Sequence, residues 1–222
     1  MAVLSVVSLG TGSAEYLTRG GEAAMRNAKQ LVLRTVRSPI ASFLTEQGFD
    51  FDTLDDLYEQ CEDFDAFHQA AAVTLFSRMK EGDLCYVVSD AAFDGTVFAL
   101  QRLKPRDLEL RIVPGVSLAD CCLSLIKRQS GHVRIMSACE LEESKLLPAE
   151  PLLLCELYSR ECAGDCKLKL MELLPDELPV TLITGREEDG TLQAEEIPLM
   201  ELDRQKKYDH LMAVYIPPVP ME

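Results

Sequence analysis

The sequence predicts an α/β protein with two α/β domains, a parallel-sheet domain in the first half and a mixed-sheet domain in the second. Apolar, β-rich runs alternate with helix-patterned segments along the chain, an order that builds a mostly parallel sheet covered on both faces. The 222 residues suffice for one large or two small domains. With 47% hydrophobic and 27% charged residues, the composition is that of a globular protein, which excludes disorder as the dominant state.

Strands of the first half are expected where short apolar runs end at glycine, proline or polar residues. They are Val3–Leu9, Leu31–Leu33, Leu84–Val88 and Leu108–Val113. Helices are expected between them for three reasons. Thr18 is a helix cap, Pro39 suits the first turn of a helix, and apolar residues repeat at helical spacing from Phe64 onward. These helices are Thr18–Ala28, Pro39–Gln47, Phe64–Lys80 and Thr96–Leu103.

In the second half, strands become more frequent than helices. The expected strands are Val133–Met136, Leu152–Leu157, Val180–Thr184, Leu192–Ile197 and Leu211–Ile216, and the expected helices are Ser117–Lys127 and Gly164–Leu174. The segment GREEDG joins the third and fourth of these strands, which predicts an antiparallel hairpin with a wide loop. We therefore divide the chain into a parallel domain at residues 1–116 and a mixed domain at residues 117–222.

The charge of the chain limits its partners and its location. There are 37 acidic and 22 basic side chains, which leaves a net charge of −15. Nucleic-acid binding requires a cationic surface, so no nucleic-acid partner is expected. No apolar run approaches the ~20 residues of a membrane span. The N-terminal segment MAVLSVVSLGTGS lacks the basic start of a signal peptide and predicts a strand, so we expect a cytoplasmic protein without membrane contact.

The eight cysteines do not form the pattern of a disulfide framework. Several lie in apolar segments, such as Cys85 and Cys155, where a thiol behaves as a small hydrophobe, so eight free thiols are expected. Only Cys162 and Cys166 approach metal-ligand spacing, as C-x3-C, and no metal site is predicted. Nine acids without a lysine or arginine lie between residues 37 and 78, which is typical of a solvated acidic surface.

Two loops follow strands and precede helices, where α/β proteins bind ligands. The first, Gly10–Glu15, resembles a dinucleotide-binding turn, but Glu15 stands where the third glycine belongs. No acid follows the second strand, which ends in Arg34, so the sequence argues against NAD, FAD and a Rossmann methyltransferase. The second loop, Ser89–Gly95, has a carboxylate that can accept ligand hydroxyls or amines, or it is a capped helix start with Asp94 at the N-cap.

A third loop of this kind is Val113–Ser117, where Ser117 is either a cap or part of a ligand-binding turn. No catalytic constellation is recognisable beside these loops. His68, His132 and His210 are far apart in sequence, and there is no GxSxG motif for a hydrolase nucleophile. The EExxE set of magnesium-dependent pyrophosphohydrolases is also absent. No catalytic residue is therefore assigned.

Four motifs, taken in order, resemble the tetrapyrrole (corrin/porphyrin) methylase family: VVSLGTGSAEYLT, GDLCYVVSDAAFDGTV, RIVPGVS and DHLMAVYIPP. The resemblance covers roughly residues 3–218 and is strongest to the methylase-like domain fused ahead of a MazG nucleotide pyrophosphohydrolase. It implies two α/β domains with a cleft between them, S-adenosylmethionine as cofactor and a small-molecule substrate. It also implies a homodimer and a MazG domain as partner, in cis or in trans.

The resemblance carries site residues over by position. The substrate-facing loop would be Gly10, Thr11 and Gly12. The cofactor-binding residues would be Ser13, Asp90, Phe93, Ser117, Leu118, Tyr158, Gly185 and Met212. The family's Gly-Asp-Pro tripeptide is Ser89-Asp90-Ala91 here, and the first loop lacks the proline that follows its glycines. Loss of glycine restricts close backbone approach, and loss of proline removes a fixed φ.

Three functions follow from the resemblance. The main one is an S-adenosylmethionine-dependent methyltransferase of tetrapyrrole methylase type whose methyl acceptor is unknown. The alternative is a catalytically weak or inactive cofactor-binding module that regulates a MazG-type nucleoside triphosphate pyrophosphohydrolase. A third is methylation of an rRNA 2′-hydroxyl or a diphthamide precursor, although the acidic charge argues against RNA. A porphyrin-like polycarboxylate would need cations, for which the candidates are Arg19, Arg34, Arg37, Arg160 and Arg186.

Overall fold

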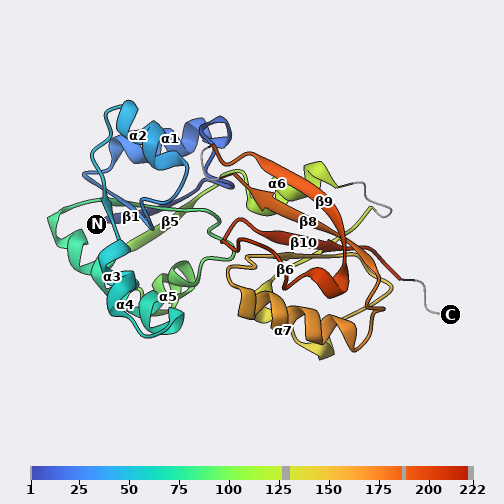
Figure 1. Ribbon diagram of the computed structural model, residues 1–222. Coiled ribbons are helices and arrows are strands. Elements are labelled where there is room, and N and C mark those ends of the chain that lie inside the picture. The colour runs from blue at the N-terminus through green and yellow to red at the C-terminus, as the bar shows by residue number, and fades with distance from the viewer. Residues whose placement is uncertain (1, 127–130, 187–188, 220–222) are drawn as a thin grey trace. The chain divides into compact units, whose positions relative to one another are not determined.

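The computed structural model describes residues 2–126, 131–186 and 189–219, which form two compact units (Figure 1). Unit 1 contains residues 2–117 together with Asp189 and Gly190, and unit 2 contains residues 118–186 and 191–219. Each unit has a five-stranded sheet with helices on both faces. The two α/β domains expected from the sequence, one parallel and one mixed, are therefore confirmed.

The sheet of unit 1 is parallel throughout, with strand order β3-β2-β4-β1-β5. Its strands are β1 (Val3–Ser8), β2 (Gln30–Leu33), β3 (Asp52–Thr53), β4 (Leu84–Val88) and β5 (Glu109–Val113). Its helices are α1 (Arg19–Asn27), α2 (Ile40–Glu46), α3 (Asp55–Gln60), α4 (Phe64–Arg78) and α5 (Gly95–Leu103). Figure 1 shows α1 and α2 on one face of this sheet and α4 and α5 on the other.

The central strand β4 explains why the sequence has continuous apolar runs. All five of its residues are buried. Tyr86 and Val88 pack into the core under α4 and α5, whereas Cys85 and Val87 pack into the core under α1 and α2. Successive residues of a strand point to opposite faces, so a strand covered on both sides must be apolar at every position.

The acidic stretch after Arg37 is more structured than the sequence indicates, because it contains β3 and α3. Asp55, at the start of α3, accepts hydrogen bonds from the Thr35 hydroxyl (2.6 Å) and the Val36 backbone N–H (2.9 Å). It thereby ties α3 to the loop after β2. The other eight acids of the stretch are exposed, as expected of a solvated surface. Both elements are too short for hydrophobic periodicity to reveal them.

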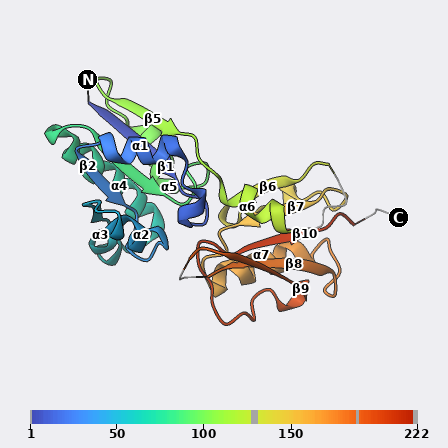
Figure 2. The same cartoon turned by 90° about the horizontal axis from the view of Figure 1, so that it is seen from above.

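The sheet of unit 2 is mixed, with strand order β6-β7-β10-β8-β9. Its strands are β6 (Arg134–Ser137), β7 (Leu152–Cys155), β8 (Pro179–Gly185), β9 (Leu192–Pro198) and β10 (Ala213–Ile216), and its helices are α6 (Leu118–Leu125) and α7 (Arg160–Met171). Only β6 and β7 pair in parallel. The predicted antiparallel hairpin is present as β8 and β9 (Figure 2). Helix α7 covers one face of the sheet and α6 the other.

Several element boundaries in unit 2 differ from the prediction, and two of the differences have a local physical reason. Helix α7 begins at Arg160 rather than Gly164, because the hydroxyl of Ser159 accepts a hydrogen bond from the Cys162 N–H (3.1 Å) and caps the helix there. Strand β7 ends at Cys155 rather than Leu157, because Glu156 has a φ of 66°. A non-glycine residue rarely adopts this conformation, and it turns the chain out of the strand.

The sequence predicts no segment long enough to span a membrane. No helix in the described part of the chain is long and apolar enough to cross a bilayer.

Candidate functional site

The carboxyl ends of β4, β1 and β5 lie side by side at one edge of the parallel sheet. A loop follows each strand: loop 1 (residues 9–13) after β1, loop 2 (residues 89–94) after β4, and loop 3 (residues 114–117) after β5. These overlap the three segments predicted from the sequence, whose outer residues belong to the adjoining helices and to β5. Parallel α/β sheets bind their ligands at this edge, so the loops form the candidate site of unit 1.

Ser8, the last residue of β1, joins the three loops. Its hydroxyl oxygen accepts a hydrogen bond from the Ala91 N–H of loop 2 (3.0 Å). Beside it, the Gly10 N–H of loop 1 donates to the Ser89 carbonyl (2.8 Å). A Cβ at Gly115 of loop 3 would lie only 2.5 Å from the Ser8 carbonyl oxygen. Ser8 is buried, and it was not predicted as a site residue because a single serine inside the run Val3–Leu9 carries no motif.

Loop 1 is a tight turn built on glycine. Gly10 and Gly12 have φ values of 60° and 80°, which glycine adopts at little cost. Thr11 is fully buried, and its hydroxyl accepts a hydrogen bond from the Ser13 N–H (3.4 Å). Ser13 caps the short 3-10 helix Ala14–Tyr16, which follows the loop directly, by accepting a hydrogen bond from the Glu15 N–H (3.4 Å), and α1 begins at Arg19.

Loop 2 is shaped by Asp90, which is 5% exposed. One carboxylate oxygen accepts a hydrogen bond from the Ala92 N–H (2.9 Å), and the Asp90 carbonyl accepts from the N–H groups of Phe93 (3.2 Å) and Asp94 (3.0 Å). Ala91 stands where the resembling tripeptide has proline, which has no N–H to donate to Ser8. Alanine in place of the family's proline thus permits a buried hydrogen bond between loop 2 and Ser8.

A partly buried ion pair lies at the end of loop 2. Asp94 caps α5, as the sequence allowed: one carboxylate oxygen accepts from the Val97 N–H (3.1 Å) and the other lies 2.6 Å from the Arg34 guanidinium. The Asp94 side chain is 2% exposed. Arg34 follows β2, where a dinucleotide fold would place an acid, and so links the ends of β2 and β4 through this carboxylate.

His68 on α4 completes this polar cluster. Its Nδ1 atom lies 3.0 Å from the buried Thr96 hydroxyl. Burial lowers the pKa of His68 below its usual 6.5, although the Asp94 carboxylate acts in the opposite direction. Burial also raises the pKa of the Tyr86 hydroxyl well above its usual range. Both groups are therefore neutral at pH 7.

Unit 2 holds four of the predicted cofactor residues: Leu118, Tyr158, Gly185 and Met212. Tyr158 follows β7, Gly185 ends β8 and Met212 precedes β10, which pairs antiparallel with both strands. These three residues consequently lie at one edge of the mixed sheet. The Leu157 N–H donates to the Met212 carbonyl (3.0 Å) and holds two of these segments together. Leu118 is buried at the start of α6.

The remaining predicted residues, Ser13, Asp90, Phe93 and Ser117, belong to unit 1 together with the substrate-loop residues Gly10, Thr11 and Gly12. The structure brings the members of each group to one edge of their own sheet. The assignment of either group to a cofactor or substrate stays a prediction.

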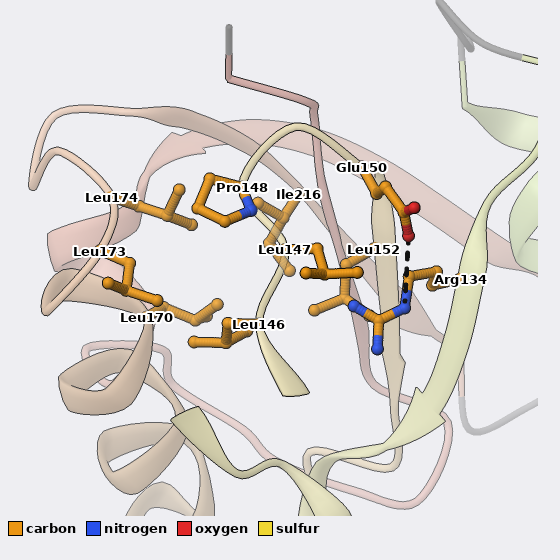
Figure 3. A pocket seen from close by; sticks show the side chains of 10 residues that line it. All are labelled: Arg134, Leu146, Leu147, Pro148, Glu150, Leu152, Leu170, Leu173, Leu174 and Ile216. Carbon is orange, nitrogen blue, oxygen red and sulfur yellow. Dashed lines mark ion pairs between the residues drawn. The ribbon is translucent and has the colours of Figure 1, made fainter. Parts of the chain in front are cut away.

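An apolar pocket in unit 2 lies at the opposite edge of the mixed sheet, near the end of α7 (Figure 3). Leucines of α7 and of the segment before β7 form its walls, and Ile216 at the end of β10 contributes. Its charged residues, Arg134 and Glu150, pair with each other at 3.6 Å. With no polar group directed at a ligand, this pocket is a weaker candidate than the loops.

Comparison with known proteins identifies relatives of the whole chain. The model of the family described as Tetrapyrrole (Corrin/Porphyrin) Methylases matches residues 3–188. The protein called "Uncharacterized protein YabN" from Bacillus subtilis (strain 168) is 29% identical over 223 aligned residues, covering 99% of this chain and 45% of that protein. The chain thus spans about half the length of this curated relative.

Two solved structures share the fold. The cobalamin biosynthesis precorrin-6Y methylase of Archaeoglobus fulgidus has a TM-score of 0.67 at 13% identity, with 98% of each chain covered. The uroporphyrin-III-C-methyltransferase of Thermus thermophilus has a TM-score of 0.66 at 16% identity, covering 98% of this chain and 94% of that one. At such identities the likeness concerns the fold alone.

Gly115→Ala tests the close approach of loop 3 to β1. The added methyl group would meet a backbone oxygen, which cannot move aside, so the free energy of unfolding should fall by about 1–3 kcal/mol. Gly20→Ala is the matched control, because its new Cβ has no neighbour nearer than 3.9 Å and lies in the exposed first turn of α1. That variant should be stabilised by about 0.4–1 kcal/mol. Urea denaturation measures both, and equal effects would contradict the close approach.

The lowered pKa of His68 predicts a pH dependence of stability. The unfolded chain takes up a proton near pH 6.5, whereas the native protein resists it, so stability is complete above pH 6.5 and is lost as the pH falls below it. His68→Gln should lose less stability than the wild type between pH 7.5 and 5.5 in urea titrations. His132→Gln, at an exposed position, should behave like the wild type. The same loss in all three proteins would show that His68 is not responsible.

Proposed function

Because this chain belongs to the tetrapyrrole (corrin/porphyrin) methylase family, we propose that it is an S-adenosylmethionine-dependent methyltransferase whose cofactor contacts loops 2 and 3. The observation that carries the proposal is the convergence of three loops on Ser8 at the carboxyl edge of the parallel sheet. The family model covers these loops, and its members use S-adenosylmethionine as methyl donor.

Each unit, taken by itself, has side chains whose chemistry suits this cofactor. When bound, S-adenosylmethionine supplies a methyl group activated by a positively charged sulfur. Asp90 places a buried carboxylate in loop 2, and the net charge of −15 favours a cationic ligand over a polyanion. In unit 2, Tyr158 and Met212 offer an aromatic and an apolar side chain of the kind that an adenine ring contacts. Displacement of the methyl group depends mainly on positioning, which hydrogen-bonded loops provide.

The cations proposed for a polycarboxylate acceptor are largely engaged elsewhere. Arg34 pairs with Asp94, and the Nε atom of Arg160 donates to the Asp203 carbonyl (3.0 Å). The Nε atom of Arg186 lies 2.7 Å from the end of the Gln193 side chain and donates to its amide oxygen once that amide is turned to face it. This leaves Arg19 and Arg37 as the candidates for acceptor binding, and it favours an acceptor with few carboxylates.

A regulatory role is the second proposal. Ser89 and Ala91 replace residues of the family's cofactor motif, and the Ala91 N–H is committed to Ser8. The relative in Bacillus subtilis is about twice as long as this chain, which leaves room there for a further domain. We propose a MazG-type pyrophosphohydrolase domain, in cis or in trans, as the regulated partner, and a homodimer as the assembly.

Release of S-adenosylhomocysteine on incubation with a small-molecule extract would favour the enzyme, whereas binding of S-adenosylmethionine without this release would favour the regulator.

Isothermal titration with S-adenosylmethionine tests the cofactor site. The wild type should bind in the micromolar range, corresponding to about −8 kcal/mol. Asp90→Ala should weaken binding by about 1–3 kcal/mol, because the loop loses a charged hydrogen-bond partner. Asp90→Asn keeps an acceptor for the Ala92 N–H and should weaken binding less. Asp107→Ala, an exposed acid before β5 and hence at the other edge of the sheet, should have no effect. Absence of heat at millimolar cofactor would overturn both proposals.

Two single substitutions, each restoring one residue of the family motif in loop 2, test the two departures separately. Ser89→Gly should leave cofactor affinity equal or improved, since glycine permits closer backbone approach. Ala91→Pro removes the N–H that pairs with the buried Ser8 hydroxyl, so it should cost about 1–3 kcal/mol of stability. Thermal denaturation with and without cofactor measures both effects. A stable Ala91→Pro variant would show that this hydrogen bond contributes little.

A further inference from the structure

Strand β5 is an edge strand of the parallel sheet, and in the described part of the chain no strand lies on its outer side (Figure 2). The edge strand at the other end of this sheet, β3, has only two residues. β5 has five residues, among which the Arg111 side chain is 58% exposed and Ile112 is 41% exposed. An edge of this length offers backbone hydrogen-bonding groups to another strand unless the protein blocks it.

The backbone of β5 points alternately toward β1 and away from it. The Glu109 N–H donates to the Ala2 carbonyl (3.2 Å), so the backbone groups of Glu109 are directed at β1. Every second residue of a paired strand directs its N–H and C=O groups the same way. The backbone groups of Leu110 and Ile112 therefore point outward. A second strand can pair with them without disturbing the bonds to β1.

The two faces of β5 differ in their side chains. Glu109 and Arg111 lie on one face, where they form a solvent-exposed ion pair at 2.8 Å. Leu110 and Ile112 lie on the other face, and Leu110 packs against the core under α4 and α5. An antiparallel copy of the strand presents the same residues in reverse order. Opposite charges two residues apart are consequently complementary to themselves about a two-fold axis.

We propose that β5 is the interface of a homodimer, in which it pairs antiparallel with β5 of a second copy about a two-fold axis at Leu110. This inference rests on the homodimer proposed above and names its surface. In this register, Glu109 faces the partner's Arg111 and Arg111 faces the partner's Glu109. The two Leu110 residues exchange N–H to carbonyl hydrogen bonds, and Ile112 faces the partner's Leu108. The parallel sheets of the two copies then continue into each other.

The neighbouring registers are less favourable. An axis at Glu109 places two carboxylates opposite each other, and an axis at Arg111 places two guanidinium groups opposite each other. Like charges at such positions are destabilising. An axis at Ile112 pairs Leu110 with the partner's Pro114, which has no N–H to donate. The charges and the proline therefore select the register centred on Leu110.

Lys104 lies close to this edge but leaves it open. Lysine near an edge strand commonly prevents pairing with other strands. Here the Nζ atom of Lys104 donates to the carbonyl of Leu108 (2.8 Å), which precedes β5. A carbonyl oxygen has two lone pairs, so that of Leu108 can also accept from the partner's Ile112 N–H.

The edge strands of unit 2 lack this self-complementary pattern in the described residues. Strand β9 contains Glu195 and Glu196 and no basic residue, so two copies of it would bring acids together without a cation. Strand β6 contains Arg134 and no acid, and Arg134 pairs with Glu150 of its own chain. β5 is thus the edge whose charges fit a second copy of this chain.

Cysteine cross-linking of the full chain tests the register. Leu110→Cys should form a covalent dimer by itself on mild oxidation, because a residue on a two-fold axis faces its own copy. Glu109→Cys and Arg111→Cys should each cross-link poorly alone, whereas an equal mixture of the two variants should give the mixed dimer. Glu195→Cys on β9 is the control and should stay uncross-linked. Non-reducing electrophoresis and peptide mapping identify the bonds.

Charge reversal tests the contact without oxidation. Arg111→Glu places two carboxylates opposite each other on both sides of the axis, so the dissociation constant of the dimer should rise at least about ten-fold in sedimentation equilibrium. The double variant Glu109→Arg/Arg111→Glu restores opposite charges and should return it to near the wild-type value. Glu195→Arg is the matched control and should behave like the wild type.

The outcomes separate this interface from the homodimer itself. A wild type that is monomeric at every concentration would overturn both. A dimer that Arg111→Glu leaves unchanged, or that Leu110→Cys does not cross-link, would overturn the β5 interface alone. The substituted charges are exposed, and none of these measurements requires cofactor binding or methyltransferase activity.

Discussion

The candidate site of unit 1 depends on one buried residue, Ser8. A buried hydroxyl needs a hydrogen-bond partner, and the backbone of loop 2 supplies one through Ala91. Because Ser8 ends the strand that lies between β4 and β5, this contact and the close approach of Gly115 place the flanking loops at the same point. The replacement of proline by alanine in the family motif becomes understandable here, since only a residue with an N–H can complete the arrangement.

The polar cluster of Arg34, Asp94 and His68 gives a structural role to Arg34, which the sequence suggested for substrate binding. Arg34 was a candidate for substrate binding, and it is paired with a carboxylate that is almost completely buried. Removing one partner of such a pair would leave the other charge buried and uncompensated, which is strongly destabilising. The same carboxylate caps α5, and the Asp94 N–H donates to the Asp90 carbonyl, so the start of that helix, the end of β2 and loop 2 are held by one residue.

In unit 2, predicted site residues also lie together at one edge of a sheet, although this sheet is mixed rather than parallel. Its strands run in both directions, yet Tyr158, Gly185 and Met212 lie together because each adjoins the same end of neighbouring strands. The left-handed conformation of Glu156 turns the chain out of β7 just before Tyr158.

The sequence alone determined the fold class, most strands and the three loops, because hydrophobic runs and glycine or proline breaks are local signals. It also determined the family, through motifs that each cover a single loop. It could not reveal β3 and α3, which are too short for periodicity, or the early start of α7, where a serine cap outweighs a glycine. The roles of Ser8 and Arg34 were decided only by the tertiary structure. Each of these residues acts through a partner 60 or more residues away in the chain, and local sequence carries no record of which distant groups a fold brings within hydrogen-bonding distance.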